Sequence, residues 1–388
     1  MTDPPGQSAA VSAPMVPLYD EASLGAVMPG VAAALGILIG RPAIELPAAP
    51  RVCVVLIDGL GHQLLEQEAR QAPFLGSLLA DGRVLSAGCP STTATSLGSF
   101  GTGLPPGQHG LAGYEVMDPD RGVLLNELRW DPATDPLRWQ PFPTVFEELA
   151  AAGVHVTQIG NPEFAGSGLT TAALRGGSFV GAKRLHSRVE IAVDALSRPG
   201  PGVAYLYWGD VDGAGHVHGW RSPEWRRTLR RTDRELARLA RTLPPGTLLL
   251  ITADHGMIDV PHTERMDLAD APWLCQDVTV LGGEGRFAQL YCRPDATEQD
   301  VGAVADRLAD AVGDRAWVRT RRQAIDLGWF GPTREAVRPR FGDVIVAGIG
   351  PFTLVDSRTA RPQVLKLIGQ HGSLTAAEQQ VPLLIDIV

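Results

Sequence analysis

The stretch VCVVLIDGLG, Val52–Gly61, decides the fold class because an unbroken apolar run leads directly to a carboxylate and two glycines. Six apolar residues without polar alternation are typical of a strand covered by helices on both faces. Asp58 alone could be a helix cap or turn residue. However, residues 247–252, TLLLIT, repeat the pattern and are followed closely by Asp254 and His255. Because open α/β sheets bind ligands at the carboxyl ends of their strands, the two stretches together predict a metal site.

Composition indicates a globular protein with a large core, since 44% of the 388 residues are hydrophobic and 20% are charged. A net charge of −9 gives no overall attraction to a nucleic acid polymer. The four cysteines are widely spaced without a CxxC pair, and no signal peptide or membrane-spanning stretch is evident. We therefore expect a cytoplasmic protein that does not insert in a membrane. The oligomeric state stays open, and residues 1–20 are predicted to be a disordered leader.

Alternating helical and strand patterns predict an α/β fold for residues 21–388. A helix is expected over residues 21–38, before the first strand, and the clearest helix over residues 222–243. Its many arginines could form a nucleic-acid stripe, but no aromatic residues interleave with them, so a solvated helix face is the preferred interpretation. The pattern changes after Asp254 and His255, and a small α+β insertion is expected at about 285–345. Its predicted elements are a strand at 285–293, a helix at 298–312, a strand at 316–318, a helix at 321–327 and a strand at 342–347.

A hydroxyl-rich stretch at residues 89–113, CPSTTATSLGSFGTGLPPGQHGLAG, is the second dense feature. A helix over residues 93–100 would place its amide-rich N-terminus beside Thr92 and Thr93. Such a terminus binds anions and favours a negatively charged nucleophile. Taken alone, the same pattern also fits an ordinary Ser/Thr helix cap.

A third strand, residues 203–208, is again followed by ligand-type residues, including Asp212 and His216 four residues apart. Asp210 is the alternative to Asp212, but it lacks that spacing, and His218 is a candidate for indirect support. Near the C-terminus, GQHGS at 369–373 adds another histidine. The collected candidates are Asp58, Thr93, Asp212, His216, Asp254, His255 and His371.

Three carboxylates, three imidazoles and no cysteine are what two divalent ions with open positions require, and we expect zinc. The absence of cysteine disfavours a structural zinc site. Two such ions would form the usual clamp for in-line phosphoryl transfer.

The motif order Asp … Pro-x-x-Thr … Asp-x-x-Gly-His … Asp-His-Gly … His-Gly resembles the alkaline phosphatase superfamily, and within it the nucleotide pyrophosphatase/phosphodiesterase family. The resemblance covers residues 50–388 and implies an alkaline-phosphatase-like core sheet flanked by helices. It also implies that Thr93 is the nucleophile, with Thr92 as the competitor if the register slips by one. The implied metal sites are Asp212, His216 and His371 for one zinc, and Asp58, Asp254, His255 and the Thr93 oxygen for the other.

Two departures from related sequences bear on the substrate. Family phosphodiesterases have an Asn that helps to bind phosphoryl oxygens about twenty residues after the nucleophile, where this chain has Tyr114. Sulfatases need Cys-x-Pro-x-Arg at the nucleophile, and residues 89–92, CPST, lack both the spacing and the Arg. His109 is interpreted as a loop-packing residue.

The resulting hypothesis is a two-metal hydrolase of phosphodiester or pyrophosphate bonds in small, nucleotide-type substrates, acting through a phosphothreonine. The alternatives on the same core are a phosphomonoesterase, a phosphonoacetate-type hydrolase and a phosphomutase. A metal-stabilised binding protein without activity is the alternative from another class, against which the retained hydroxyl at Thr93 argues weakly.

Overall fold

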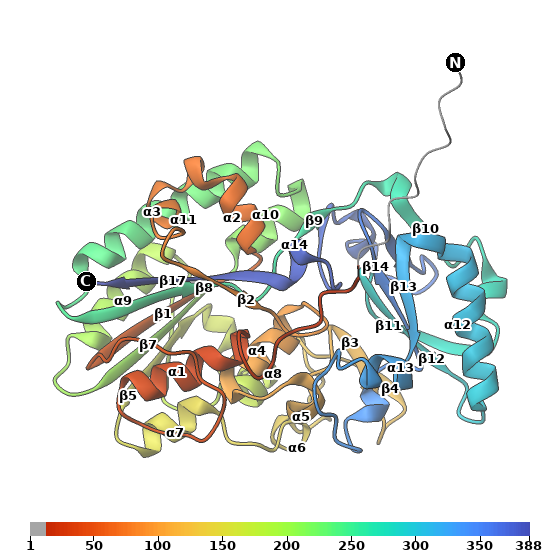
Figure 1. Cartoon of the computed structure of the whole chain (residues 1–388), viewed down its shortest axis with the longest axis horizontal. Helices are drawn as coiled ribbons and strands as arrows, with labels where there is room; N and C mark the ends of the chain where they lie inside the picture. Colours follow the sequence, from red (N-terminus) through yellow and green to blue (C-terminus); the bar gives the residue numbers. More distant parts are fainter. Residues whose placement is uncertain (1–12) are drawn as a thin grey trace.

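A computed structural model describes residues 13–388, which are built around a seven-stranded sheet (Figure 1). All of its strands are parallel except the last in the chain, β17, which is antiparallel to both of its neighbours. The predicted α/β class is therefore confirmed. The strand order is β2 (Arg83–Ser86), β17 (Gln380–Ile387), β8 (Thr247–Thr252), β1 (Arg51–Ile57), β7 (Gly202–Trp208), β5 (His155–Gly160) and β6 (Ser178–Gly181).

Helices cover both faces of this sheet, which explains why its central strands are apolar throughout (Figure 1). One face is covered by α9 and α11, which pack on each other, with the shorter α2, α3 and α10 beside them. On the other face lie α1, α4, α7 and α8. Their bounds are α1 (Val27–Ala34), α2 (His62–Gln67), α3 (Pro73–Ser77), α4 (Thr93–Thr102), α7 (Val145–Ala151), α8 (Gly168–Ala173), α9 (Leu185–Leu196), α10 (Asp210–His218) and α11 (Pro223–Thr242).

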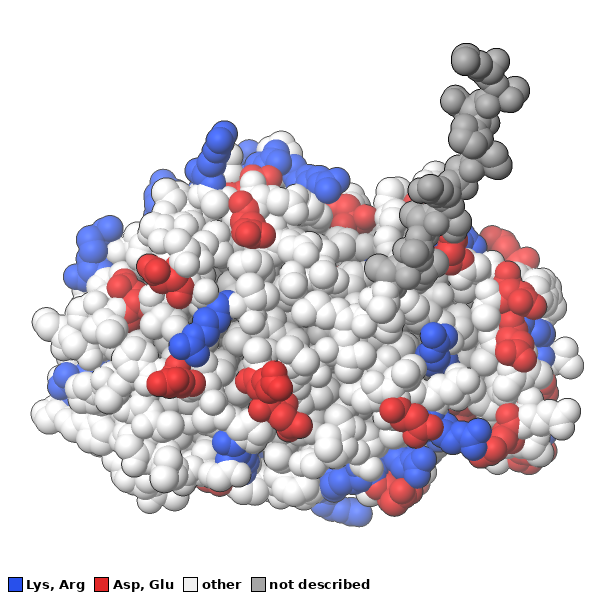
Figure 2. Space-filling model, in the orientation of Figure 1, with Lys and Arg blue, Asp and Glu red and all other residues white. Residues whose placement is uncertain are grey.

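The long helix α11 matches the predicted amphipathic pattern. It buries Trp225, Leu229, Leu236 and Leu239 and leaves most of its arginines toward solvent. On the face of the molecule in Figure 2, basic and acidic side chains are interspersed. By contrast, α1 is much shorter than the helix predicted over 21–38. A 3₁₀ turn precedes it, and Gly36 follows with a φ of 81° that a helix cannot continue through.

A second, antiparallel sheet lies beside the main one (Figure 1). Its strands run in the order β11 (Val278–Glu284), β12 (Phe287–Cys292), β14 (Val344–Gly348) and β13 (Ala316–Thr320). Helix α12 (Glu298–Val312) packs on it around a separate apolar cluster that includes Leu290, Leu308 and Val346. Sequence reasoning missed β11, whose alternation is broken by two glycines. The division of the chain into a catalytic domain and an insertion at 285–345 stays a prediction.

Further short helices and strands lie between these elements along the chain. The bounds are α5 (Pro106–His109), β3 (Glu115–Asp118), β4 (Val123–Asn126), α6 (Pro136–Trp139), β9 (Ile258–Asp259), β10 (Arg265–Asp267), α13 (Arg321–Asp326), β15 (Thr353–Val355), β16 (Gly369–Gln370) and α14 (Ala376–Gln379). Of these, β3 pairs with β4, β9 with β16 and β10 with β15.

Part of the predicted disordered leader lies outside the described residues, and part contacts the folded chain. The Met15 amide donates to the Leu374 carbonyl at 2.9 Å, and the Tyr19 hydroxyl donates to the Trp329 carbonyl at 2.7 Å. All four cysteines are free. Within residues 13–388, no helix combines the length and the apolar character needed to cross a membrane.

Candidate metal centre

Three neighbouring strands of the main sheet end at the candidate centre. Strand β1 pairs in parallel with β7 and with β8, so that Ile57 lies opposite Trp208 and Leu56 opposite Thr252. Asp58 follows β1 directly, the pair Asp254–His255 follows β8 after one residue, and α10 begins just after β7. The parallel register therefore brings together residues that are almost 200 positions apart in the chain.

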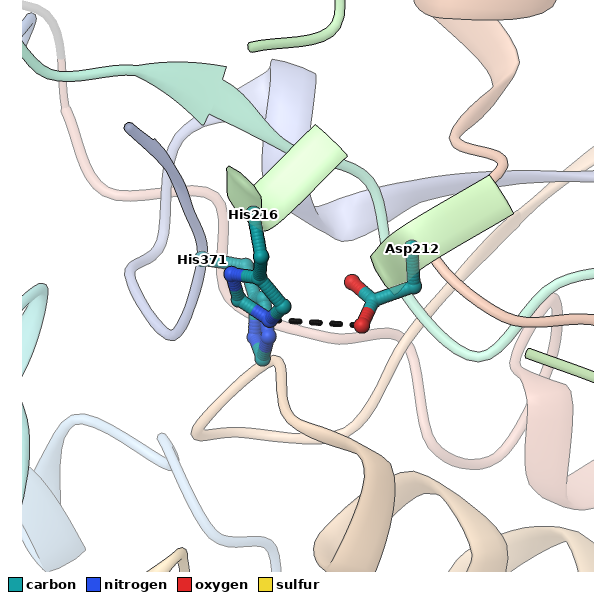
Figure 3. A group of neighbouring side chains, drawn as sticks. All are labelled: Asp212, His216 and His371. Carbon is teal, nitrogen blue, oxygen red and sulfur yellow. Dashed lines mark ion pairs between the residues drawn. The ribbon is translucent and has the colours of Figure 1, made fainter. Parts of the chain in front are cut away.

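Asp212, His216 and His371 form one ligand group (Figure 3). Asp212 and His216 lie four residues apart in α10, and Asp212 Oδ2 is 3.2 Å from His216 Nε2. His371 reaches the same point from the loop after β16, with its ring centroid 5.1 Å from that of His216. Both histidines place Nδ1 against a backbone carbonyl, Gly369 for His216 at 2.7 Å and Ser91 for His371 at 2.9 Å. Because a carbonyl only accepts, the proton is on Nδ1, and Nε2 is free to bind a cation.

The second ligand group gathers around His255. Its Nε2 is 3.3 Å from Asp58 Oδ1 and 3.3 Å from Thr93 Oγ1. Its Nδ1 lies 3.0 Å from the Gly256 carbonyl, which fixes the ring in the same way. Asp254 Oδ2 is 3.7 Å away from Nε2. Ligand atoms of Asp58, Asp212 and His255 all lie within 4.8 Å of one another, so Asp212 lies within reach of both groups.

The carboxylates of this centre fit divalent cations because each has a buried oxygen that no described residue hydrogen-bonds. These atoms are Asp58 Oδ1, Asp212 Oδ1 and Asp254 Oδ2. The other oxygen of Asp254 accepts from the amides of Gly59 and His255, both at 3.1 Å. Burying unpaired carboxylate oxygens beside one another costs several kcal/mol unless a cation compensates. The donor set of oxygens and imidazole nitrogens is that of a zinc-type centre.

Without a cation, the buried carboxylates of this centre repel one another, and their pKa values are shifted. Burial, followed by the charges of Asp254 and Asp212, raises the pKa of Asp58 well above its usual value. Burial alone would also raise the pKa of Asp212, but His216 outweighs it and lowers that pKa. For His216, burial opposes the charged form, yet Asp212 raises its pKa to about 9. Asp212 and His216 thus form an ion pair in the metal-free protein. A metal bound at His216 Nε2 would have to displace the proton on that atom.

We expect the metal-free protein to melt at a lower temperature as the pH rises from about 7 to 9. The pKa of Asp58 is raised, that of His216 is raised to about 9 from 6.5, and that of Glu284 is raised to about 8, chiefly by burial. A group with a raised folded pKa gives stability that is lost as the pH passes through that value, so all three act in the same direction. Calorimetry after chelation tests this, with metal-reloaded protein as the control. A melting temperature that increases over this range would contradict it.

Thr93 is the first residue of α4, and its side chain is 9% exposed. All ten residues of α4 are buried, which its small side chains permit. At Gly101, for example, a Cβ atom would lie 1.8 Å from the Ala173 carbonyl oxygen. The N-terminus of α4 therefore points its free amides at the centre from a fixed position, and these amides favour negative charge there.

A cleft of about 560 Å³ opens next to the centre and is lined by Thr93, Asp58, Asp212, His216 and His371. Tyr114, predicted to replace an oxyanion-binding Asn, lines the same cleft. Asp210, the alternative to Asp212, is exposed and belongs to neither ligand group of the described residues.

His109 is a packing residue, as predicted. It is fully buried between Ser99 Oγ, 3.1 Å from Nε2, and the Leu111 amide, which donates to Nδ1 at 3.0 Å. Burial and the nearby Arg340 lower its pKa to about 3, so it is neutral at physiological pH.

Sequence reasoning missed two residues at this centre. Tyr207, near the end of β7, donates its hydroxyl to Asp58 Oδ2. Its pKa is raised well above normal by burial and by Asp58, so it stays a donor. Glu284 ends β11 in the second sheet and lines the cleft, with a buried Oε1 that no described residue hydrogen-bonds. Tyr207 could have been found from its position in β7, just before the Asp212 motif. Glu284 could not, because β11 itself was not predicted.

Solved structures share this architecture. Murine ectonucleotide pyrophosphatase/phosphodiesterase 5, as an inactive Thr-to-Ala variant with AMP, matches with a TM-score of 0.69 and 17% identity. The match covers 86% of this chain and 87% of that chain. Phosphonoacetate hydrolase from Sinorhizobium meliloti, with phosphonoformate, matches with a TM-score of 0.67 and 20% identity over 89% of this chain and 92% of that chain. At these identities the likeness concerns the fold.

A search of curated protein sequences found no match. The profile of the type I phosphodiesterase/nucleotide pyrophosphatase family, in contrast, matches residues 52–374, a span that includes the three strand ends, Thr93 and His371. Because this match covers most of the chain, and the fold is that of alkaline phosphatase superfamily members, the resemblance in the motifs is confirmed. The chain belongs to the type I phosphodiesterase/nucleotide pyrophosphatase family, and this membership indicates a phosphoryl hydrolase.

Proposed function

We propose that this protein is a two-metal hydrolase of phosphodiester or pyrophosphate bonds that uses Thr93 as its nucleophile. The observation that carries this proposal is the position of the Thr93 hydroxyl. It lies 3.3 Å from His255 Nε2, at the start of a buried helix, on the wall of the 560 Å³ cleft and beside buried carboxylates with unpaired oxygens. Membership of the family supports phosphoester hydrolysis.

Asp212, His216 and His371 would hold one ion, and Asp58, Asp254, His255 and the Thr93 oxygen the other. Zinc suits this set of imidazoles and carboxylates without thiolates. Ions bound here would lower the pKa of the Thr93 hydroxyl and stabilise charge on the attacking and leaving oxygens. Asp212 belongs to both residue groups, so its carboxylate would add negative charge near both ions.

The residues of the chain orient the reacting atoms. The hydroxyl of Tyr207 holds Asp58, and the carbonyls of Gly256, Gly369 and Ser91 hold the three imidazole rings. Thr93 Oγ1 gives its proton to solvent and forms a bond to phosphorus while the bond from phosphorus to the leaving oxygen breaks, and that oxygen takes up a proton from solvent. Water then attacks the phosphothreonine, which restores the hydroxyl and releases the phosphate product. The N-terminus of α4 favours the negative charge on Oγ1 before attack.

The proposal predicts that zinc-loaded protein hydrolyses bis(4-nitrophenyl) phosphate faster than 4-nitrophenyl phosphate, and that chelation abolishes both activities until zinc is restored. A monoester dianion needs additional positive charge, and no unpaired Arg or Lys among the described residues lines the cleft. Undiminished activity after exhaustive chelation, with no metal found by elemental analysis, would contradict the two-metal mechanism. Preference for the monoester would contradict the diester assignment, and no turnover of either ester would favour a binding protein.

A further inference from the structure

The charges lining the cleft restrict what it can bind. Of the described residues that line it, Arg361 alone is a Lys or Arg. Its Nη2 atom lies 3.3 Å from Glu115 Oε1, with side chains 39% and 31% exposed. Asp356, another acidic residue of the lining, is bound by Arg358, with 2.7 Å between Asp356 Oδ2 and Arg358 Nη2. Outside the metal centre the cleft therefore offers a substrate no cationic side chain without an acidic partner.

Apolar and aromatic side chains form much of the remaining wall. Phe164 and Phe179 line the cleft on the side of the main sheet, together with Leu97, Ile159 and Leu169. The Phe164 ring packs edge-on against Tyr207, 5.8 Å between centroids, and is still 38% exposed. A surface of this kind gains free energy by covering an uncharged group. Desolvating a second phosphate there, with no free cation to pair with it, is unfavourable.

Resting on the proposed function, we propose that the substrate is a phosphodiester with one negative charge and uncharged substituents, and that Glu115 determines this specificity. Glu115 does so by neutralising Arg361, the guanidinium that would otherwise attract a further phosphate or carboxylate. Glu115 comes from the β3–β4 hairpin, where it also accepts from Asn126 Nδ2 at 3.3 Å. The proposal narrows the substrate class away from nucleoside polyphosphates and phosphonocarboxylates.

The test compares two substrates that differ by one phosphate group. These are the 4-nitrophenyl ester of thymidine 5′-phosphate and its 3′-phosphorylated counterpart, which share the leaving group. In the zinc-loaded protein we expect kcat/KM to be at least about tenfold lower for the 3′-phosphorylated ester. In Glu115→Gln the ratio of the two kcat/KM values should shift toward the 3′-phosphorylated ester by about fivefold. This is the size expected when one partly exposed ion pair is broken and Arg361 becomes free. Equal use of both esters by the unmodified protein, or no shift in Glu115→Gln, would overturn the proposal.

Glu335→Gln is the matched control. It makes the same change in another Arg–Glu pair, in which Arg338 Nη1 is 2.9 Å from Glu335 Oε1. The Glu335 side chain is 86% exposed and does not line the cleft. The ratio of kcat/KM for the two esters in Glu335→Gln should equal that of the unmodified protein. A shift in this control would mean that net charge causes the change in selectivity, and would overturn the role of Glu115.

Equilibrium binding separates this inference from the proposed function. Dissociation constants of both esters for zinc-loaded Thr93→Ala should show the same preference, and Glu115→Gln on that background should reduce it. Absent turnover in the unmodified protein contradicts the proposed function. An absent binding preference contradicts the charge selection, whether or not the esters are hydrolysed.

Discussion

Thr93→Ala should lower kcat/KM for a nitrophenyl diester by about 10³-fold or more, because it removes the only protein atom proposed to form a bond with phosphorus. The metals should be largely retained, since six carboxylate and imidazole ligands remain on four segments of the chain. Steady-state kinetics together with elemental analysis of the same preparation measure both effects. Loss of activity with metal retained distinguishes a nucleophile from a mere ligand.

Two neighbouring changes serve as controls for this result. Thr93→Ser keeps a hydroxyl at the start of α4 and should recover most of the lost activity. Thr92→Ala removes the adjacent hydroxyl, which also lines the cleft, and should reduce activity much less. Full activity in Thr93→Ala, or a larger loss in Thr92→Ala than in Thr93→Ala, would overturn the assignment of the nucleophile.

The main sheet could be predicted because the apolar composition of its central strands indicates that both of their faces are buried. Strands β1 and β8 are apolar runs without alternation, and the residues after them are polar ligands. Parallel pairing then requires that Asp58 and Asp254 meet, whichever residues lie between them. Local spacing was sufficient to group Asp212 with His216, which lie four residues apart on one face of α10.

The parts that could not be predicted depend on contacts between the two sheets. Strand β11 contains Gly282 and Gly283, and Glu115 O lies 2.6 Å from where a Gly282 Cβ would be. Gly282 is thus explained by the close approach of the β3–β4 hairpin. Gly283 is explained by its φ of 75° and by the Phe287 carbonyl, 2.2 Å from where its Cβ would be. No local pattern reveals either contact. Glu284, Glu115 and Arg361 converge on the cleft through these contacts. For this reason the ligands of the centre were identifiable from the sequence, but the residues that we propose to select the substrate were not.

Glu378→Ala should lower the free energy of unfolding by about 3–5 kcal/mol, because it leaves a buried guanidinium without its counter-charge. Arg286 and Glu378 are both 0% exposed and are joined by bonds of 3.1 Å from Nε and 2.6 Å from Nη2. The remaining donors of Arg286 bind the carbonyls of Gly348, Gly350 and Phe352. The pair thus ties the second sheet to α14, and Glu378→Ala would leave a charge in the interior that no other acid replaces.

The same change should also weaken metal retention, since Glu378 Oε1 accepts from the Ser373 amide at 3.0 Å, two residues after His371. Urea unfolding measures the stability, and titration with a chelator measures the zinc affinity. Glu378→Gln keeps the shape without the charge and should give an intermediate loss, which supplies a folded variant if Glu378→Ala does not fold. Glu335→Ala breaks an exposed pair and should cost at most about 1 kcal/mol. Equal stability of Glu378→Ala and Glu335→Ala would mean that the buried pair does not hold the second sheet against the metal centre.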